Sequence, residues 1–199
     1  MCLHNIYLCI PDIAADLGIT SILDCGCGSM VWMAKILTDI EASRANLSVP
    51  FITYHGVDIV PGIVTAAREV GAAVDHEGAW TFSHGDLTHF SFLDTLSRDL
   101  QPMDSAHHDV QKPEILQTET SFDLIIVRDV FFHLSFQRIQ CALNNLSLLA
   151  MRRRTDASER GQVAPVTHLL ATSNNDTYPY TAKSYTDTLK MGGYRCGML

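Results

Sequence analysis

The amino-acid sequence predicts an α/β fold, in which a doubly wound, mostly parallel sheet lies between two layers of helices in a three-layer α/β/α arrangement. Two observations predict it. Short β-rich runs alternate along the chain with segments of helical periodicity, and this alternation requires crossover connections between parallel strands. The run at 122–127 (FDLIIV) is continuously apolar, as is typical of a strand buried on both faces. A length of 199 residues fits a single domain over 1–199.

Strands are expected where β-branched and aromatic residues gather between turn-forming residues. They fall at 21–24, 51–57, 80–84, 122–127 and 166–171. Helices are expected where apolar residues recur three and four positions apart. These positions are Met33, Ile36, Leu37 and Ile40 in the first helix, Ile63, Ala66, Ala67 and Val70 in the second, and Ile139, Ala142, Leu143, Leu146 and Ala150 in the third. Pro61 suits the first turn of the second helix, Gly71 its end, and Ser135 the N-cap of the third.

Two polar stretches interrupt this alternation. Residues 94–121 contain two prolines, and residues 151–165 are charged and end in a glycine- and proline-containing segment. Because both lie between expected elements, we interpret them as surface insertions within one domain and not as linkers between two. The basic cluster Arg152–Arg154 would then lie in a solvated loop.

The composition restricts the partners of the chain. Fourteen Lys and Arg against 22 Asp and Glu give a formal net charge of −8. This balance argues against a nucleic-acid partner, because nucleic-acid affinity depends on clustered basic side chains. No apolar run is long enough to span a bilayer, and the first residues lack the features of a secretory signal.

The cysteines indicate a reducing compartment. There are six, in a chain long for a disulfide scaffold, and none forms a CxxC pair. We therefore expect a cytoplasmic protein. Cys25 and Cys27 form a CxC, but no further ligands lie at a suitable spacing, so no metal site is expected.

Acidic residues and glycines follow the expected strands. The first strand leads into Asp24-Cys25-Gly26-Cys27-Gly28, the second ends at Asp58, the third at Gly85-Asp86 and the fourth at Arg128-Asp129. In open α/β sheets, ligands bind outside the carboxyl ends of the strands. Three acids at successive strand ends predict one shared site, although Asp is also common as a turn-forming cap. Acids there suit a positively charged ligand and disfavour a pyrophosphate.

Four motifs, in order, resemble those of class I S-adenosylmethionine-dependent methyltransferases. They are LDCGCG at 23–28, GVDIV at 56–60, HGDLT at 84–88 and FDLIIVRDVFFHLS at 122–135. The resemblance extends from about residue 20 to about residue 175. It implies the Rossmann-like methyltransferase fold, S-adenosylmethionine as cofactor, and S-adenosylhomocysteine as product.

The resemblance also implies roles for individual residues. Asp24, Gly26, Cys27 and Gly28 would form the loop that holds the amino-acid part of the cofactor. Asp58 would bind the ribose hydroxyls, with Ile59 against the adenine. The turn of Gly85 and Asp86 would face the adenine amino group, with Leu87 beside it. Arg128 and Val130 would lie close to the methyl donor.

The chain departs from the family pattern at three places. Met30 stands where a third glycine is common, which makes the loop bulkier. Only about 20 residues precede the first strand, so the helical cover of the cofactor is expected to be short. Only about 26 residues follow strand 166–171, so the C-terminal strand pair of the sheet is expected to be reduced. An uncapped sheet edge there would allow a homodimer.

The expected reaction is in-line displacement at the methyl group of the sulfonium, onto a small-molecule or protein acceptor. The protein then mainly supplies alignment, and a base is needed only if the acceptor must lose a proton. Asp129 and His133 are the candidate catalytic residues, four positions apart and on one face if this turn is helical. His133 could equally pack at the start of the helix and bond the backbone.

Two other functions remain open. An NAD(P)-dependent oxidoreductase would have G-x-G-x-x-G, but its last glycine is replaced by Val31, and Asp58 lies 34 residues after Asp24, where about 20 are expected. A non-catalytic, Rossmann-like protein that binds a partner is favoured by Met30 and the short ends.

Overall fold

The computed structural model describes residues 6–44, 51–75, 78–100, 121–159 and 166–172. Its centre is a five-stranded, entirely parallel sheet in the order β3-β2-β1-β4-β5. The strands are β1 (Ser21–Cys25), β2 (Thr53–Asp58), β3 (Trp80–His84), β4 (Leu124–Arg128) and β5 (His168–Thr172). The order runs outward from β1 in both directions, so the sheet is doubly wound, as predicted, and its topological switch lies between β1 and β4.

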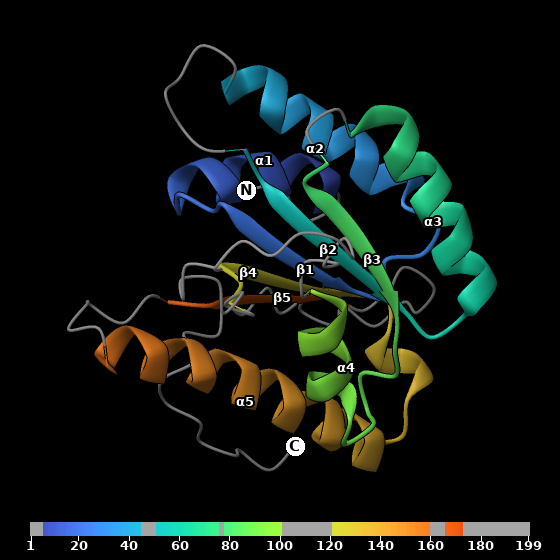
Figure 1. The fold of residues 1–199 in the computed structure, drawn as a ribbon, viewed down its shortest axis with the longest axis vertical. Helices are drawn as coiled ribbons and strands as arrows, with labels where there is room; N and C mark the ends of the chain where they lie inside the picture. The colour runs from blue at the N-terminus through green and yellow to red at the C-terminus, as the bar shows by residue number, and fades with distance from the viewer. Residues whose placement is uncertain (1–5, 45–50, 76–77, 101–120, 160–165, 173–199) are drawn as a thin grey trace, which may run out of the picture.

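Helices cover both faces of this sheet, and the three-layer prediction is confirmed. Figure 1 shows α1 (Ile6–Asp16), α2 (Val31–Arg44) and α3 (Pro61–Val74) on one face, and α4 (Phe92–Asp99) and α5 (Phe136–Glu159) on the other. A short 3-10 helix, η1 (Phe131–His133), joins β4 to α5. No helix within the described residues is both long and apolar enough to cross a membrane.

Two apolar cores fill the spaces between the layers. Alternate residues of β1 point into different cores: Ile22 packs with the α1–α3 helices, whereas Leu23 packs with α4 and α5. Because every residue of β1 after Ser21 is buried, the strand has no solvent-facing side. Burial on both faces explains why a short strand such as SILDC carries apolar side chains at consecutive positions.

The structure corrects the predicted end of α3. The helix continues through Gly71 to Val74, and the Asp75 backbone N–H donates to the Gly71 carbonyl at 2.8 Å. Gly71 is buried against the ring of Phe82, and a Cβ there would lie 2.7 Å from Phe82 Cε2. This glycine therefore serves close helix-to-sheet packing and not helix termination.

Both predicted insertions are also corrected in part. Residues 94–99 belong to α4, which buries Phe92, Leu93 and Leu96. Residues 151–159, with the cluster Arg152–Arg154, belong to α5 and not to a loop. The remainder of the insertions, 101–120 and 160–165, and the expected reduction of the strand pair at 173–199 lie outside the described residues.

Candidate functional site

The carboxyl ends of β1, β2 and β3 meet at one edge of the sheet, beside the switch between β1 and β4 (Figure 1). The loop after β1 turns sharply into α2 there. Its residues Gly26, Gly28 and Met30 all have positive φ, at 88°, 60° and 65°. The Gly26 and Cys27 N–H groups donate to the Val57 carbonyl at 2.7 and 3.1 Å, which ties the loop to β2.

Gly26 must be a glycine for two reasons. Its φ of 88° lies in the region that disfavours any Cβ. A Cβ at this position would also overlap Val130 Cγ2, so Val130, two residues beyond β4, packs directly over the loop. Gly28 differs, because a Cβ there would meet no atom of the described residues within 4 Å.

Asp24, near the end of β1, is completely buried. The Tyr54 hydroxyl donates to its Oδ2 at 2.9 Å, while Oδ1 has no hydrogen-bond partner among the described residues. Burial raises the pKa of Asp24 to about 7; the Tyr54 hydrogen bond and the charge of Arg128 lower it, and the charge of Asp58 raises it. A buried, half-satisfied carboxyl of this kind suits a cationic hydrogen-bond donor.

Asp58, the last residue of β2, anchors the loop. Its Oδ2 accepts from the Gly28 N–H at 3.1 Å, and its Oδ1 accepts from the Val60 N–H at 2.9 Å. A carboxylate offers about four lone-pair sites, so Asp58 keeps capacity for ligand hydroxyls. Ile59 follows with a 55% exposed side chain, available to pack against a flat ring.

The turn after β3 is held from two sides. The Gly85 N–H donates to the Asp58 carbonyl at 3.0 Å, which joins this turn to the end of β2. Asp86 Oδ1 accepts from the backbone N–H and the hydroxyl of Thr88 at 2.8 and 2.7 Å, so Asp86 also acts as a turn former. Leu87 is buried, and its carbonyl accepts from Asn145 Nδ2 of α5 at 2.8 Å.

Arg128 and Asp129 end β4 on the other side of the switch. The Arg128 guanidinium lies 4.4 Å from the centre of the Trp32 ring on α2, and its Nη1 pairs with Asp129 Oδ2 at 3.2 Å. Asp129 has φ of 56°, an uncommon conformation for a residue with a side chain. Such strained residues cluster at functional sites.

His133 lies in η1 and is exposed, and its ring is tilted at 45° to that of Phe132, with a centroid distance of 3.9 Å. The condition for a shared helical face with Asp129 is not met, because η1 begins only at Phe131 and Asp129 has a left-handed backbone. The catalytic roles of Asp129 and His133 stay predictions.

Cys25, the last residue of β1, and Cys27, in the loop after it, are buried thiols. Burial raises the pKa of Cys25 and of Cys27, and the charge of Asp24 raises both further, so neither forms a thiolate readily. Within the described residues no group of three or more His, Cys, Asp or Glu side chains is placed to hold a metal ion.

Neither the Tyr54–Asp24 hydrogen bond nor the contact between Arg128 and the Trp32 ring was predicted from the sequence. Tyr54 reaches Asp24 only through the β1–β2 register, in which Ile22 pairs with Tyr54 and Asp24 with Gly56. This diagonal neighbour relation could have been found by aligning the two strands as parallel partners.

Comparison with solved structures agrees with this fold. The chain is similar to the methyltransferase domain of bacterial CtHen1-CN, with a TM-score of 0.50 and 14% identity over 83% of this chain and 63% of that one. It is also similar to a proposed sarcosine dimethylglycine methyltransferase from Galdieria sulphuraria, with a TM-score of 0.51 and 12% identity over 84% of this chain and 46% of that one. No protein-family model and no curated protein matches the sequence.

The chain thus spans less than two thirds of the length of both solved structures. At these identities the likeness concerns the fold. The strand order, the glycine loop at the switch and the structural likeness agree: the chain has the Rossmann-like fold of class I S-adenosylmethionine-dependent methyltransferases.

Proposed function

We propose that the protein binds S-adenosylmethionine and transfers its methyl group to a small-molecule or protein acceptor. The observation that carries the proposal is the buried Asp24 carboxyl, whose Oδ1 lacks a partner among the described residues, immediately before the Gly26–Gly28 loop at the switch of the sheet. An ammonium group would satisfy that oxygen, whereas a pyrophosphate would be repelled.

The remaining strand ends suit the rest of such a cofactor. Asp58 would accept from the ribose hydroxyls while it holds the loop, and the exposed Ile59 side chain would cover the adenine. Asp86 and the backbone beside Leu87 would face the adenine amino group, and Arg128 would line the donor end of the site. When bound, the cofactor supplies an activated methyl group on a sulfonium.

The turn after β4 would supply the residues that act on the methyl acceptor. In-line displacement needs the acceptor atom held in line, and an alcohol or amine acceptor must also lose a proton. Asp129 and His133 are both solvent-accessible on this turn, and we assign them that proton-accepting role.

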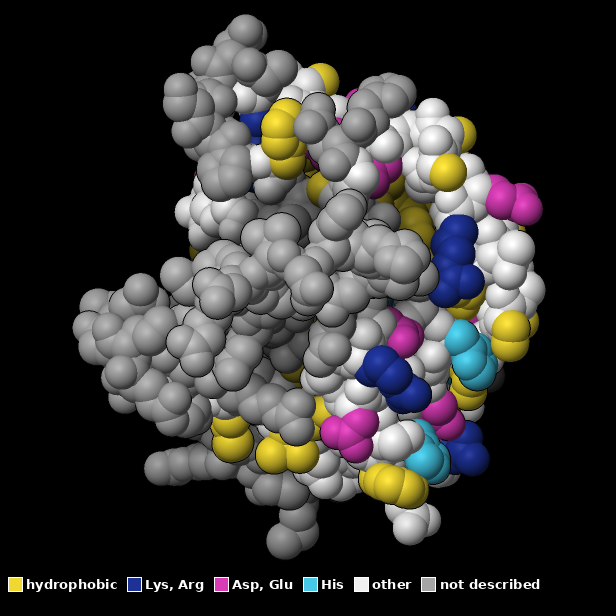
Figure 2. All heavy atoms as spheres, viewed as in Figure 1, with side chains coloured by type: hydrophobic (Ala, Val, Ile, Leu, Met, Phe, Trp, Pro, Cys, Tyr) yellow, Lys and Arg dark blue, Asp and Glu magenta, His cyan; other side chains and the backbone are white. Residues whose placement is uncertain are grey.

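Lys and Arg side chains stand apart from one another on the face drawn in Figure 2, among acids and histidines, which favours a small molecule or protein over a nucleic acid.

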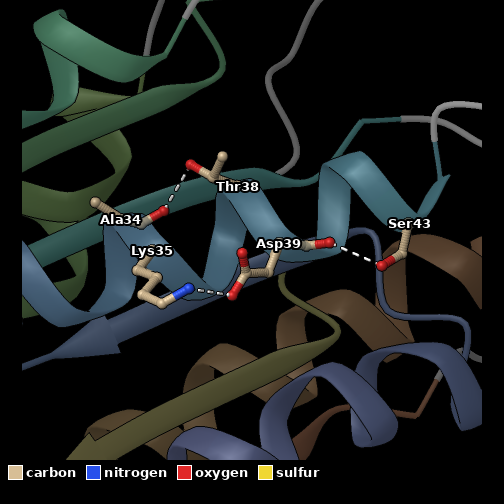
Figure 3. Close-up of polar contacts among 5 residues, drawn as sticks. All are labelled: Ala34, Lys35, Thr38, Asp39 and Ser43. Carbon is tan, nitrogen blue, oxygen red and sulfur yellow. Dashed lines mark hydrogen bonds and ion pairs between the residues drawn. The ribbon is translucent and has the colours of Figure 1, made fainter.

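Calorimetric titration tests the proposal. S-adenosylhomocysteine and S-adenosylmethionine should bind with micromolar-class affinity, whereas NADH should not. Asp58→Asn should weaken S-adenosylhomocysteine binding about tenfold or more, because a charge-assisted contact is lost. Asp39→Asn is the matched control: the Asp39 carboxylate pairs with the exposed Lys35 side chain on α2, as Figure 3 shows, and loss of its charge should leave the affinity unchanged.

Two outcomes would contradict the proposal. Tight NADH binding without a response to the other two compounds would indicate an oxidoreductase. Failure of all three to bind the folded protein would favour a non-catalytic protein that binds a partner.

A further inference from the structure

The ring of Tyr54 is fixed by packing, and its hydroxyl group makes the contact with Asp24. Its side chain is 1% exposed, and its ring is fixed in the first core by an edge contact with Trp80 at 6.4 Å and a tilted contact with Phe82 at 5.9 Å between centroids. The hydroxyl of a buried tyrosine needs a hydrogen-bond partner. Here it donates to Asp24 Oδ2 at 2.9 Å.

The carboxyl of Asp24 lies among groups of both signs. Arg128 approaches from β4, and Asp58 from the end of β2. The thiols of Cys25, at the end of β1, and Cys27, in the loop after it, lie nearby, and Tyr54 faces the carboxyl from β2. Arg128 is itself paired with Asp129, and the hydrogen bond that the structure describes to Asp24 comes from neutral Tyr54. Burial dominates and raises the pKa of Asp24 to about 7, so the carboxyl is mostly protonated below neutrality.

We propose that Tyr54 is a positioning residue that holds Asp24 Oδ2 and leaves Oδ1 for the ammonium group of the cofactor, and that Asp24 releases one proton to solvent when that group binds. The O–H bond of the carboxylic acid breaks, water takes the proton, and the ammonium N–H donates to the carboxylate formed. This inference rests on the proposed function and adds a proton linkage to it.

The link between proton release and cofactor binding predicts how the affinity changes with pH and with the Tyr54→Phe substitution. Cofactor affinity should rise with pH up to about pH 7 and level off above it, because the proton must be removed before binding. Tyr54→Phe keeps the ring but removes the donor that favours the carboxylate. Affinity should then fall by about tenfold, and the midpoint of the affinity–pH curve should move upward.

The experiment is calorimetry with S-adenosylhomocysteine near pH 6, in buffers of different ionisation enthalpy, which counts protons exchanged on binding. The wild type should release close to one proton, and the number should fall toward zero at about pH 8.5. Ser83→Ala is the matched control. It also removes a buried hydroxyl from the sheet, one that bonds His55 and not Asp24, so proton release should be unchanged.

A ligand-free measurement completes the test. The infrared difference spectrum between the wild type and Asp24→Asn near pH 6 should show the band of a protonated carboxyl. This measurement needs neither a cofactor nor the Tyr54 variant. Binding without proton release, or absence of that band, overturns the inference while the proposed function stands. No binding of S-adenosylhomocysteine at any pH refutes both.

Discussion

Met30 combines two features that rarely occur together. Its backbone is left-handed, with φ of 65°, yet its side chain is completely buried in the core beneath α1–α3. The left-handed conformation costs about 1–2 kcal/mol for a residue with a Cβ, whereas burial of a Met side chain contributes about 1.5–3 kcal/mol. The bulk expected in the glycine loop is thus directed into the core.

Met30→Gly should therefore destabilise the protein. The substitution removes the backbone strain but leaves a cavity in the core. Replacing a buried Met by a small residue costs about 2–5 kcal/mol, from which the relieved strain is subtracted. We expect the free energy of unfolding in urea to fall by about 1–3 kcal/mol. Met30→Leu, which keeps the strain and most of the volume, should cost less than about 1.5 kcal/mol. A more stable glycine variant would mean that backbone strain outweighs packing.

His55 is a second buried titratable residue. Its Nδ1 lies 2.7 Å from the Thr81 hydroxyl and its Nε2 lies 2.8 Å from the Ser83 hydroxyl. Both ring nitrogens therefore have a hydroxyl partner, which suits a neutral imidazole with one N–H donor and one acceptor nitrogen. Burial, with the charge of Arg68 second, lowers the pKa of His55 to about 4.

At the scale of elements, α3 provides a matched pair of glycines. Gly62 lies in the first turn, where a Cβ would meet no atom within 4 Å in the part of the chain that the structure describes, whereas a Cβ at Gly71 would lie 2.7 Å from the Phe82 ring. Gly62→Ala should raise the free energy of unfolding by about 0.5–1 kcal/mol through helix propensity. Gly71→Ala should lower it by about 1–3 kcal/mol through overpacking. Urea denaturation measures both, and equal effects would show that Phe82 moves aside freely.

The strands were predictable within about two residues because β-branched and aromatic residues gather between turn-forming residues, and in β4 because burial on both faces leaves a continuous apolar run. The helices were less predictable where their apolar periodicity is short or ends early. In α4, Phe92, Leu93 and Leu96 are followed directly by a long polar stretch, which concealed the helix. The last turns of α5 continue through charged residues with no apolar pattern, so the predicted helix stopped at Ala150.

At the scale of the whole molecule, topology decided which site residues were predictable. Parallel strands bring Asp24, Asp58 and Asp86 to one edge whatever their exact contacts. The Tyr54–Asp24 hydrogen bond depends on strand register and the unsatisfied Oδ1 on complete burial, and neither is a property of local sequence. The same holds for the left-handed backbone of Asp129, which separates it from His133.

The two buried groups give the whole molecule opposed pH dependences. For His55 the folded pKa is about 4 against an ordinary 6.5, so the unfolded state binds more protons in that window and stability is lost as pH falls through it. For Asp24 the folded pKa is about 7 against 3.8, so the folded state binds more protons and stability is lost as pH rises. Between about pH 4 and pH 6.5 the two slopes offset each other.

Single variants should reveal each slope. With Asp24→Asn, the free energy of unfolding should rise by up to about 3 kcal/mol from pH 4 to pH 6.5, the contribution of His55 alone. With His55→Asn it should fall over the same range, and the double variant should again be nearly flat. Urea denaturation across these pH values measures the three profiles relative to the wild type. Parallel profiles would show that the two groups keep their ordinary pKa values in the fold, because only a difference between folded and unfolded pKa generates a slope.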